Sequence, residues 1–201
     1  MLLRALRPFA GHPEVRHVVV ALPPGYADRP PEWLAKVRVE RLSIVAGGAQ
    51  RADSVRAALA ALPPETRVVL VHDAARPFVS RGTIDAVIAR ARAGVGAVAA
   101  VPVTDTLKEV GEGTARATPR VARTVDRDRI WRAQTPQGFP FQMLRDAYAQ
   151  LAAGNGVPSD DAEVCERAGF PVELIPDSPY NFKVTTADDF RIAEALAREL
   201  R

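Results

Sequence analysis

Short apolar runs alternate with helical patterns along most of the chain. Strand-like runs of β-branched and small apolar residues occupy residues 17–22, 41–46, 67–72, 95–103 and 182–184. Runs of this length that alternate with helices are typical of βαβ units. The pattern predicts an α/β fold with a doubly wound, mainly parallel sheet.

Apolar residues at helical spacing fall between these runs. They predict helices over residues 2–10, 51–62, 141–153 and 160–168, one that begins near Ser80 and one that begins near Thr186. Ser80 is a suitable N-cap, because its hydroxyl can accept a hydrogen bond from a free helix N–H. Thr186 and Asp189 have the spacing of a capping box.

The pattern changes between residues 104 and 126. Four apolar residues lie among charges, and two glycines mark a turn: Leu107, Val110, Val121, Val125, Gly111 and Gly113. We expect this segment, residues 104–126, to be a projecting β-hairpin arm. Isolated hairpins are marginal in water, and this one has too few apolar residues for a core of its own. The arm therefore predicts a homodimer.

Length and composition fit one domain over residues 1–201. The sequence is 47% hydrophobic and 25% charged, and no apolar run approaches the ~20 residues that a membrane span needs. Residues 1–10 have no signal-peptide cleavage pattern. Cys165 is the one cysteine of the sequence, so no internal disulfide is expected. These features predict a cytoplasmic protein with no membrane partner.

The basic character of the chain comes mainly from arginine. The net charge is +3, and the 27 basic residues include lysine only at positions 36, 108 and 183. No basic run is interleaved with aromatic residues, as a nucleic-acid surface would require. Small anionic substrates are therefore favoured over nucleic acid.

Asp73 follows the clearest buried strand, within the segment HDAARP at residues 72–77. Open α/β sheets bind ligands at the carboxyl ends of their strands, so this carboxylate is placed to hold a ribose or a metal ion. An aspartate that only caps a turn is the alternative. For His72 a structural role is the favoured interpretation.

Gly47 and Gly48 join a predicted strand to a predicted helix. Glycines at such a junction let the backbone approach a ligand, and the free N–H groups of the helix start point toward it. This geometry suits a nucleotide. A Gly-Gly pair that forms only a turn is the alternative.

Two further segments each carry one cation, Arg127 in residues 124–127 and Lys183 in residues 181–185. Lys183 is the more informative of the two, because lysine is rare in this chain, although a solvated lysine at a strand end is the alternative. Asp160 and Asp161 are interpreted as acids in the first turn of a helix.

Five segments, in this order, resemble the 2-C-methyl-D-erythritol 4-phosphate cytidylyltransferase family: GGxxRxxSV, HDAARP, TxDR, TPQ and NxKVT. They occupy residues 47–55, 72–77, 124–127, 135–137 and 181–185. The resemblance covers nearly the whole chain. It implies a Rossmann-like nucleotidyltransferase that uses Mg²⁺ to transfer a cytidylyl group from CTP to 2-C-methyl-D-erythritol 4-phosphate in isoprenoid precursor synthesis, with release of pyrophosphate.

The implied reaction explains why no pair of nucleophile and base is evident. The attacking phosphate is already anionic, so no general base is required. Catalysis then depends on positioning and on neutralisation of charge at the α-phosphate.

The resemblance also implies roles for individual residues. For CTP it implies contacts with Gly47, Gly48, Arg51, Ser54, Asp73 and Ala74. Asp73 is also the expected metal ligand. Arg127 and Lys183 are implied to be catalytic and to orient the acceptor, which is also bound by Asp105, Thr106, Ser159 and Asp160. The arm is implied to swap onto a second subunit and to complete its acceptor site.

One part of the family pattern has no counterpart in these residues. The family begins with a strand, an AAGxGxRM loop and a PKQ segment that hold the triphosphate. We therefore expect an N-terminally truncated domain that is inactive or weakly active. Two alternatives remain: a cytidylyl- or sugar-nucleotide transferase with another acceptor, and a dimeric binding protein without turnover.

Overall fold

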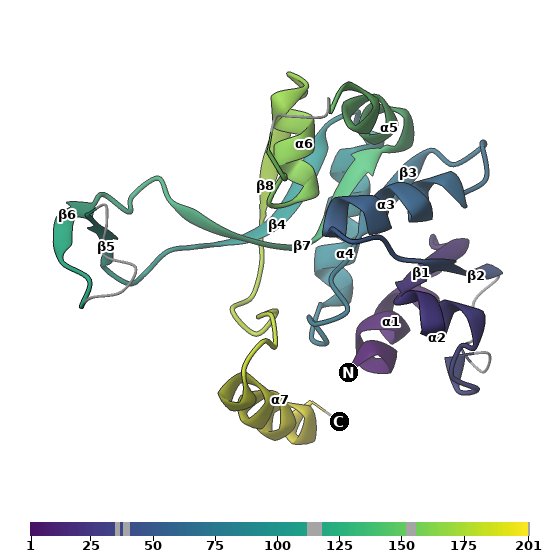
Figure 1. The fold of residues 1–201 in the computed structure, drawn as a ribbon, viewed down its shortest axis with the longest axis horizontal. Helices are drawn as coiled ribbons and strands as arrows, with labels where there is room; N and C mark the ends of the chain where they lie inside the picture. Colours follow the sequence, from purple (N-terminus) through teal and green to yellow (C-terminus); the bar gives the residue numbers. More distant parts are fainter. Residues whose placement is uncertain (35–36, 38–40, 112–117, 152–155, 201) are drawn as a thin grey trace.

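The computed structural model describes residues 1–34, 37, 41–111, 118–151 and 156–200. The strands are β1 (His17–Leu22), β2 (Arg41–Ala46), β3 (Val68–Val71), β4 (Gly96–Pro102), β5 (Leu107–Val110), β6 (Val121–Val125), β7 (Trp131–Pro140) and β8 (Val172–Pro176). The helices are α1 (Leu2–Ala10), α2 (Pro24–Asp28), α3 (Arg51–Ala60), α4 (Arg81–Arg92), α5 (Phe141–Gln150), α6 (Asp161–Arg167) and α7 (Ala187–Glu199). Figure 1 shows the body of the molecule, the projecting arm of β5 and β6, and α7 below the body.

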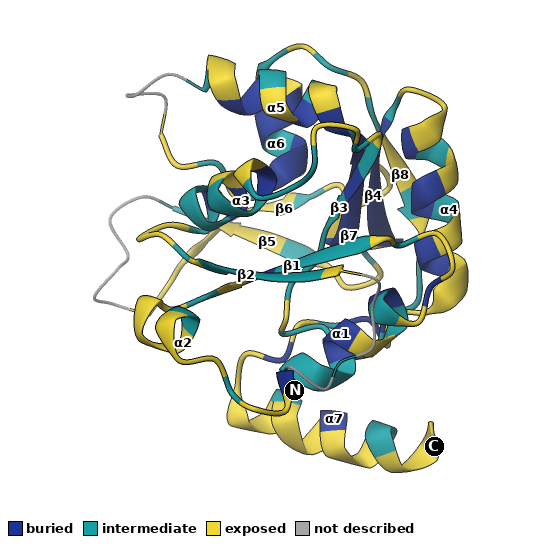
Figure 2. Ribbon diagram, turned by 90° about the vertical axis from the view of Figure 1, so that its right-hand side faces the viewer, coloured by how far each residue is buried: buried dark blue, intermediate teal, exposed yellow. Residues whose placement is uncertain are grey.

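The main sheet has the strand order β3-β7-β4-β8. β4 is parallel to β8, whereas β7 is antiparallel to both β3 and β4. β3, β4 and β8 therefore point in one direction. Residues 96–101 of β4 are all buried between the helices that cover the sheet (Figure 2), and strands covered on both faces are apolar throughout. The predicted α/β fold with a mainly parallel sheet is confirmed.

β1 and β2 form a parallel pair of their own, with His17 opposite Arg41 and Leu22 opposite Ala46. In the described part of the chain, no ladder joins β1 to β3. A cavity of about 1230 Å³ is lined by apolar side chains of both strands, including Val20 and Val69, and it extends to Asp73. The facing edges of β1 and β3 thus lack a shared neighbour, which leaves two strand edges open to pairing.

Several predicted elements are confirmed. β1 and β2 have the predicted bounds, and α1, α3, α5 and α6 begin within one residue of the expected positions. Ser80 caps α4 by accepting a hydrogen bond from the N–H of Thr83 at 3.0 Å. Thr186 and Asp189 form the predicted capping box of α7. The predicted helix from residue 51 extends too far, since α3 ends at Ala60.

Other parts of the pattern are wrong or incomplete. Residues 182–184 are not a strand; the segment passes close to the turn after β3, where the N–H of Val184 donates to the carbonyl of Ala75 at 2.9 Å. The pattern did not predict α2, β7 or β8. β7 contains proline, glycine and two glutamines, which argue against a strand on local grounds. The sheet tolerates the two buried glutamines because Gln134 Nε2 donates to the carbonyl of Asn181 and Gln137 Nε2 donates to Asp160.

The arm is an antiparallel hairpin in which Leu107 lies opposite Val125. It extends away from the body (Figure 1), and Val110 and Val121 are exposed in the single chain. Gly111 follows β5 as predicted, whereas Gly113 lies outside the described residues.

Among the helices that the structure describes, none has both the length and the apolar character needed to cross a bilayer.

Candidate active site

The Gly47–Gly48 loop connects β2 to α3 and is held tightly at both ends. The N–H of Gly47 donates to the carbonyl of Leu22 at 2.7 Å, and the N–H of Gly48 donates to Ser54 Oγ at 3.1 Å. A Cβ on Gly48 would lie 2.3 Å from the Cβ of Asp53, so a side chain here would clash. Close packing against the start of α3 therefore requires glycine.

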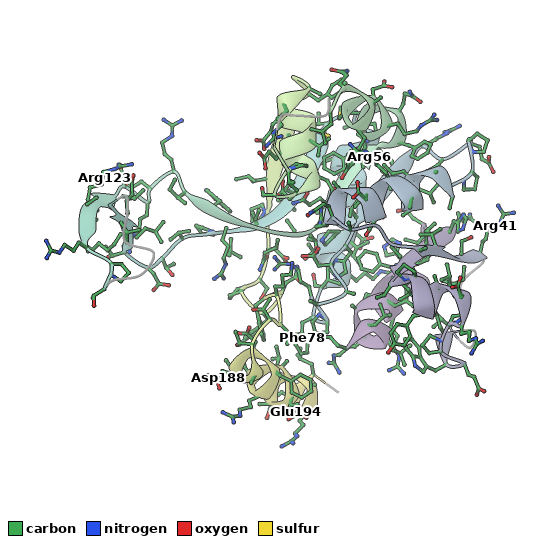
Figure 3. All side chains as sticks on the ribbon, viewed as in Figure 1. Arg41, Arg56, Phe78, Arg123, Asp188 and Glu194 are labelled. Carbon is green, nitrogen blue, oxygen red and sulfur yellow. The ribbon has the colours of Figure 1, made fainter. Side chains whose placement is uncertain are left out.

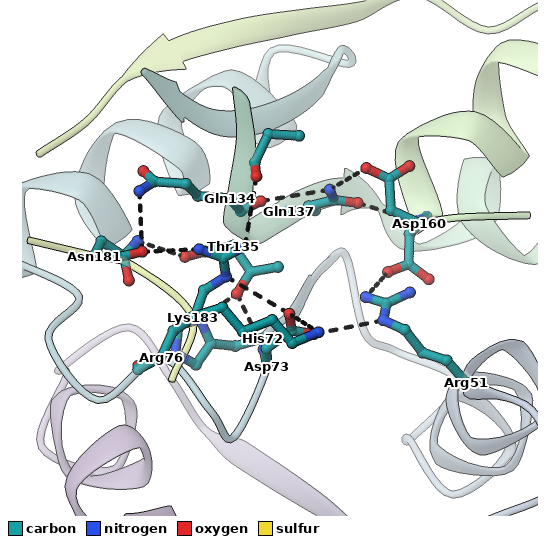
Figure 4. Close-up of polar contacts among 12 residues, drawn as sticks. Arg51, His72, Asp73, Arg76, Gln134, Thr135, Gln137, Asp160, Asn181 and Lys183 are labelled. Carbon is teal, nitrogen blue, oxygen red and sulfur yellow. Dashed lines mark hydrogen bonds and ion pairs between the residues drawn. The ribbon is translucent and has the colours of Figure 1, made fainter. Parts of the chain in front are cut away.

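Asp73 lies at the carboxyl end of β3 among three cations (Figure 4). Its carboxylate is 3.2 Å from Lys183 Nζ, 3.5 Å from Arg51 Nε and 3.6 Å from Arg76 Nε. Burial opposes ionisation of Asp73, but Lys183 and Arg51 outweigh it and hold the pKa of the carboxyl below its usual value. We call these four residues the Asp73 cluster. Its excess of positive charge suits an anionic ligand.

A chain of hydrogen bonds fixes the turn that carries Asp73. The N–H of Asp73 donates to Thr135 Oγ1 at 3.0 Å, and His72 Nε2 lies 2.9 Å from the carbonyl of Arg76. Because a carbonyl only accepts, Nε2 carries the proton, and Nδ1 accepts from the Thr135 hydroxyl at 2.9 Å. Burial lowers the pKa of His72 to about 4, so the ring is neutral near pH 7. His72 thus has the structural role that the sequence favoured.

Asn181 anchors the segment that carries Lys183. The Asn181 side chain is fully buried, and its Nδ2 donates to the carbonyl of Thr135 and to Asp177 Oδ2, both at 2.7 Å. Its backbone carbonyl accepts from Arg76 Nη1 at 2.8 Å. Lys183 therefore reaches Asp73 from a segment fastened to β7 and to the turn after β3.

Ser159 and Asp160 lie at the start of α6. Asp160 is the N-cap, with Oδ1 accepting from the N–H of Glu163 at 2.9 Å and Oδ2 accepting from Gln137 Nε2 at 2.8 Å. The N–H and hydroxyl of Ser159 both donate to Glu163, and these bonds lower the pKa of Glu163 to about 2. Asp161 is the first residue of α6 and is fully buried.

Of the remaining predicted residues, one adjoins the Asp73 cluster and three lie at the base of the arm. Ala74 is exposed in the turn after β3, next to Asp73. Asp105, Thr106 and Arg127 are exposed at the base of the arm, where the guanidinium of Arg127 donates to the carbonyl of Thr104. Figure 3 shows Arg123 far out on the arm, well away from Arg56 on α3. No contact in the described part of the chain joins these arm residues to the Asp73 cluster.

Sequence reasoning did not assign roles to several residues that build the site. Arg76, Thr135 and Gln137 lie inside recognised segments, so closer attention to the 72–77 and 135–137 motifs would have found them. Asp161 was predicted only as an acid in the first turn of a helix, and Tyr148, which supports Asp161 without contacting the Asp73 cluster, carried no signal. The Tyr148 hydroxyl reaches the Asp161 carboxylate only when α5 packs on α6.

The site offers Mg²⁺ few protein ligands. Within the described residues, no group of three His, Cys, Asp or Glu side chains could hold a metal ion. Asp73 supplies one carboxylate, and cations approach both of its oxygens. Mg²⁺ is often bound by one or two carboxylates together with substrate phosphates. Asp73 fits a metal only in that limited role.

Together, a glycine loop, a cationic cluster at the carboxyl end of β3 and the α/β sheet define a nucleotide-binding enzyme of the nucleotidyltransferase class. The profile of the family described as "IspD: 2-C-methyl-D-erythritol 4-phosphate cytidylyltransferase" matches residues 1–199. The chain belongs to this family.

Individual relatives agree with this assignment. The 2-C-methyl-D-erythritol 4-phosphate cytidylyltransferase of Saccharopolyspora erythraea is 45% identical over 98% of this chain and 85% of that protein. A bifunctional enzyme IspD/IspF of Anaeromyxobacter dehalogenans is 44% identical over 98% of this chain, which spans 50% of that protein's length. The crystal structure of the cytidylyltransferase from Thermus thermophilus matches with a TM-score of 0.83 and 39% identity, over 98% of this chain and 89% of that chain.

Proposed function

We propose that this chain transfers a cytidylyl group from CTP to 2-C-methyl-D-erythritol 4-phosphate, giving 4-diphosphocytidyl-2-C-methyl-D-erythritol and pyrophosphate. The product feeds non-mevalonate isoprenoid precursor synthesis, and a cytoplasmic location fits this role. The observation that carries the proposal is the Asp73 cluster beside the Gly47–Gly48 loop, in a chain of this family. The further activity in the name of the bifunctional relative is not assigned to this chain.

In this reaction an oxygen of the acceptor phosphate attacks the α-phosphorus of CTP. The bond from that phosphorus to the bridging oxygen breaks, and pyrophosphate leaves with the electron pair. No proton needs to be removed from the nucleophile, so cations and positioning supply the catalysis. Lys183 suits this role, because it is partly exposed and is fastened next to Asp73.

The two substrates are proposed to meet at the Asp73 cluster. Gly48 and Ser54 contact the cytosine, while Asp73 and Ala74 lie at the ribose and phosphates. Gly47 belongs to the same CTP site, and Arg51 supports its loop. Lys183 faces the acceptor, together with Ser159 and Asp160. Asp73 would help to hold Mg²⁺, which would neutralise charge on the phosphates.

The acceptor site is proposed to be completed by a second copy of the chain. Asp105, Thr106 and Arg127 are exposed at the base of the arm, and in the described part of the chain no hydrogen bond or ion pair joins them to the Asp73 cluster. In a homodimer the arm of one subunit would bring them to the other subunit's cluster. Light scattering at micromolar concentration tests this directly, and a stable, folded monomer would contradict it.

These 201 residues alone are proposed to turn over slowly. The resemblance places a triphosphate-binding loop and two cations outside the segments that match, and each lost donor to a transition-state charge typically costs ~10²- to 10³-fold. The unpaired edges of β1 and β3 should also lower stability. A version extended upstream by one strand and one glycine-rich loop should gain both activity and stability.

Pyrophosphate release tests the proposed function in both versions. The assay contains CTP, Mg²⁺ and 2-C-methyl-D-erythritol 4-phosphate, with other nucleotides and sugar phosphates in matched reactions. Preference for this pair of substrates by the extended version supports the proposal. Equal use of another acceptor would contradict the acceptor assignment, and comparable turnover by the 201-residue chain would contradict its proposed weakness.

A further inference from the structure

Asp161 is a buried carboxylate without a part in the proposed reaction. Its Oδ2 accepts a hydrogen bond from Arg51 Nη2 at 2.6 Å, and its Oδ1 accepts one from the Tyr148 hydroxyl at 2.6 Å. Its backbone N–H donates to Gln137 Oε1 at 3.1 Å. Donors from α3 and α5 thus hold both carboxylate oxygens at the start of α6.

Arg51 lies between two carboxylates and is bound unequally by them (Figure 4). The guanidinium is 2.6 Å from Asp161 but 3.5 Å from Asp73 Oδ1. Charge-assisted hydrogen bonds are strongest near ~2.7–2.9 Å, so Asp161 is the main partner. Burial opposes the charged form of Arg51, but Asp161 outweighs it and the pKa of the guanidinium is raised.

Asp73 is the carboxylate that Arg51 would approach if Asp161 lost its charge. Lys183 and Arg76 already lie beside Asp73 Oδ2, whereas Arg51 approaches Oδ1 at a long distance. A half-buried guanidinium without its main partner gains from a closer one, because leaving a buried charge unpaired is costly. Closure of Arg51 onto Oδ1 would occupy this oxygen as well.

We propose that Asp161 is a positioning residue that holds Arg51 back from Asp73, so that Asp73 Oδ1 stays available to the nucleotide. The inference rests on the proposed function, in which Asp73 contacts the nucleotide. Asp161 acts through Arg51 and touches neither substrate. It also links the nucleotide loop to the acceptor side of the site, because it directly follows Asp160.

Binding of cytidine monophosphate, measured by titration calorimetry, is the test. This probe carries the base and ribose assigned to the loop and to Asp73, and it needs no triphosphate loop. Asp161→Asn keeps the side-chain size and removes the charge. We expect its Kd for cytidine monophosphate to rise about tenfold, on the scale of one hydrogen bond to a charged group.

Tyr148→Phe is the matched control. It removes the other donor to the same buried carboxylate and should also lower thermal stability, but it leaves the Arg51–Asp161 pair in place. Its Kd should stay within about twofold of the unsubstituted protein, because the lost donor is neutral and is bonded to Asp161 Oδ1, not to Arg51 or Asp73. An equal loss of affinity in both variants would overturn the inference, since general destabilisation would then explain it.

A second substitution separates positioning from a structural role. Adding Arg51→Gln to Asp161→Asn removes the competing cation, so the double variant should bind cytidine monophosphate more tightly than Asp161→Asn alone. No recovery would overturn the inference. If Asp161→Asn does not fold, the double variant is compared with Arg51→Gln alone. Because Asp161 acts through Arg51, these two variants should bind cytidine monophosphate within about threefold of each other, and weaker binding by the double variant would overturn the inference.

Failure of the inference differs from failure of the proposed function. If the unsubstituted chain binds cytidine monophosphate and Asp161→Asn binds equally well, the role of Asp161 is overturned and the function stands. If the unsubstituted chain does not bind the probe at all, the nucleotide site is overturned, and the role of Asp161 with it.

Discussion

The residues assigned to the two substrates lie in two regions with opposite physical character. The Asp73 cluster is built from three separate segments, which hydrogen bonds join to one another and to the neighbouring β7 and α6. The base of the arm is exposed, and Arg127 is held there by one backbone carbonyl. The first region is organised before any ligand arrives. The second requires another surface to act on, and the proposed dimer supplies one.

The electrostatics of the two regions also differ, because Asp73 and His72 are largely buried and the charged side chains of the arm are exposed. Burial and neighbouring charges shift the pKa of Asp73 in the cluster and that of His72, which precedes it in the same turn. On the arm, the pair of Arg123 and Glu109 is exposed on both sides. Solvent and salt screen such pairs, so they contribute little to stability. The cluster should therefore respond strongly to substitution and pH, and the arm should respond mainly through assembly.

Lys183→Ala should give the largest effect. Loss of a preorganised cation at a developing charge typically costs ~10²- to 10³-fold in turnover. The measurement is pyrophosphate release by the version extended upstream. Lys108→Ala, on the arm, is the control and should stay within about twofold, because an exposed side chain of this kind contributes little. A small effect at Lys183 would remove it from the catalytic residues.

A mixing experiment separates the two regions most sharply. Arg127→Ala alone should also be strongly impaired. If Arg127 serves the other subunit, an equal mixture with Lys183→Ala should recover roughly a quarter of the unsubstituted activity, since half of the dimers then contain one intact site. Recovery is measured after the subunits have exchanged. Absence of recovery would place Arg127 and Lys183 in the same subunit's site.

The pH dependence of stability should report the burial of His72. Its pKa is about 4 in the folded chain and 6.5 ordinarily, so the unfolded chain binds the extra proton between these values. Stability should therefore fall as pH drops from 6.5 to 4, by up to about 1.4 kcal/mol per pH unit. Chemical denaturation across this range measures the slope. His72→Gln should flatten it, and an unchanged slope would contradict the burial.

The smallest expected difference between the two regions is in the free energy of unfolding at neutral pH. Asn181→Ala removes a buried amide with two hydrogen bonds, and it should lower the free energy of unfolding by about 1–3 kcal/mol. Arg123→Ala, in the exposed arm pair, should change it by about 0–1 kcal/mol. Equal losses in chemical denaturation would mean that the arm packs more tightly than the single chain shows.

Local sequence signals determined the strands that have a clear apolar pattern and the helices that begin with a capping side chain. β1 and β2 follow from runs of apolar residues, and α4 and α7 from their capping side chains, because these features act within a few residues. The glycine loop and the HDAARP segment were also found in this way. Their ordered spacing was sufficient to indicate the family.

Tertiary structure decided what depends on partners distant in sequence. β7 contains residues that locally disfavour a strand, and it forms because β3 and β4 pair with both of its edges. Residues 182–184 read as a strand, yet this segment instead brings Lys183 to Asp73. Asp161 read as a first-turn acid, and only the packing of α3, α5 and α6 buries it and gives it Arg51 and Tyr148 as partners. Local patterns in the sequence contained no signal for these contacts, because each depends on the free energy of packing between segments that lie far apart in the chain.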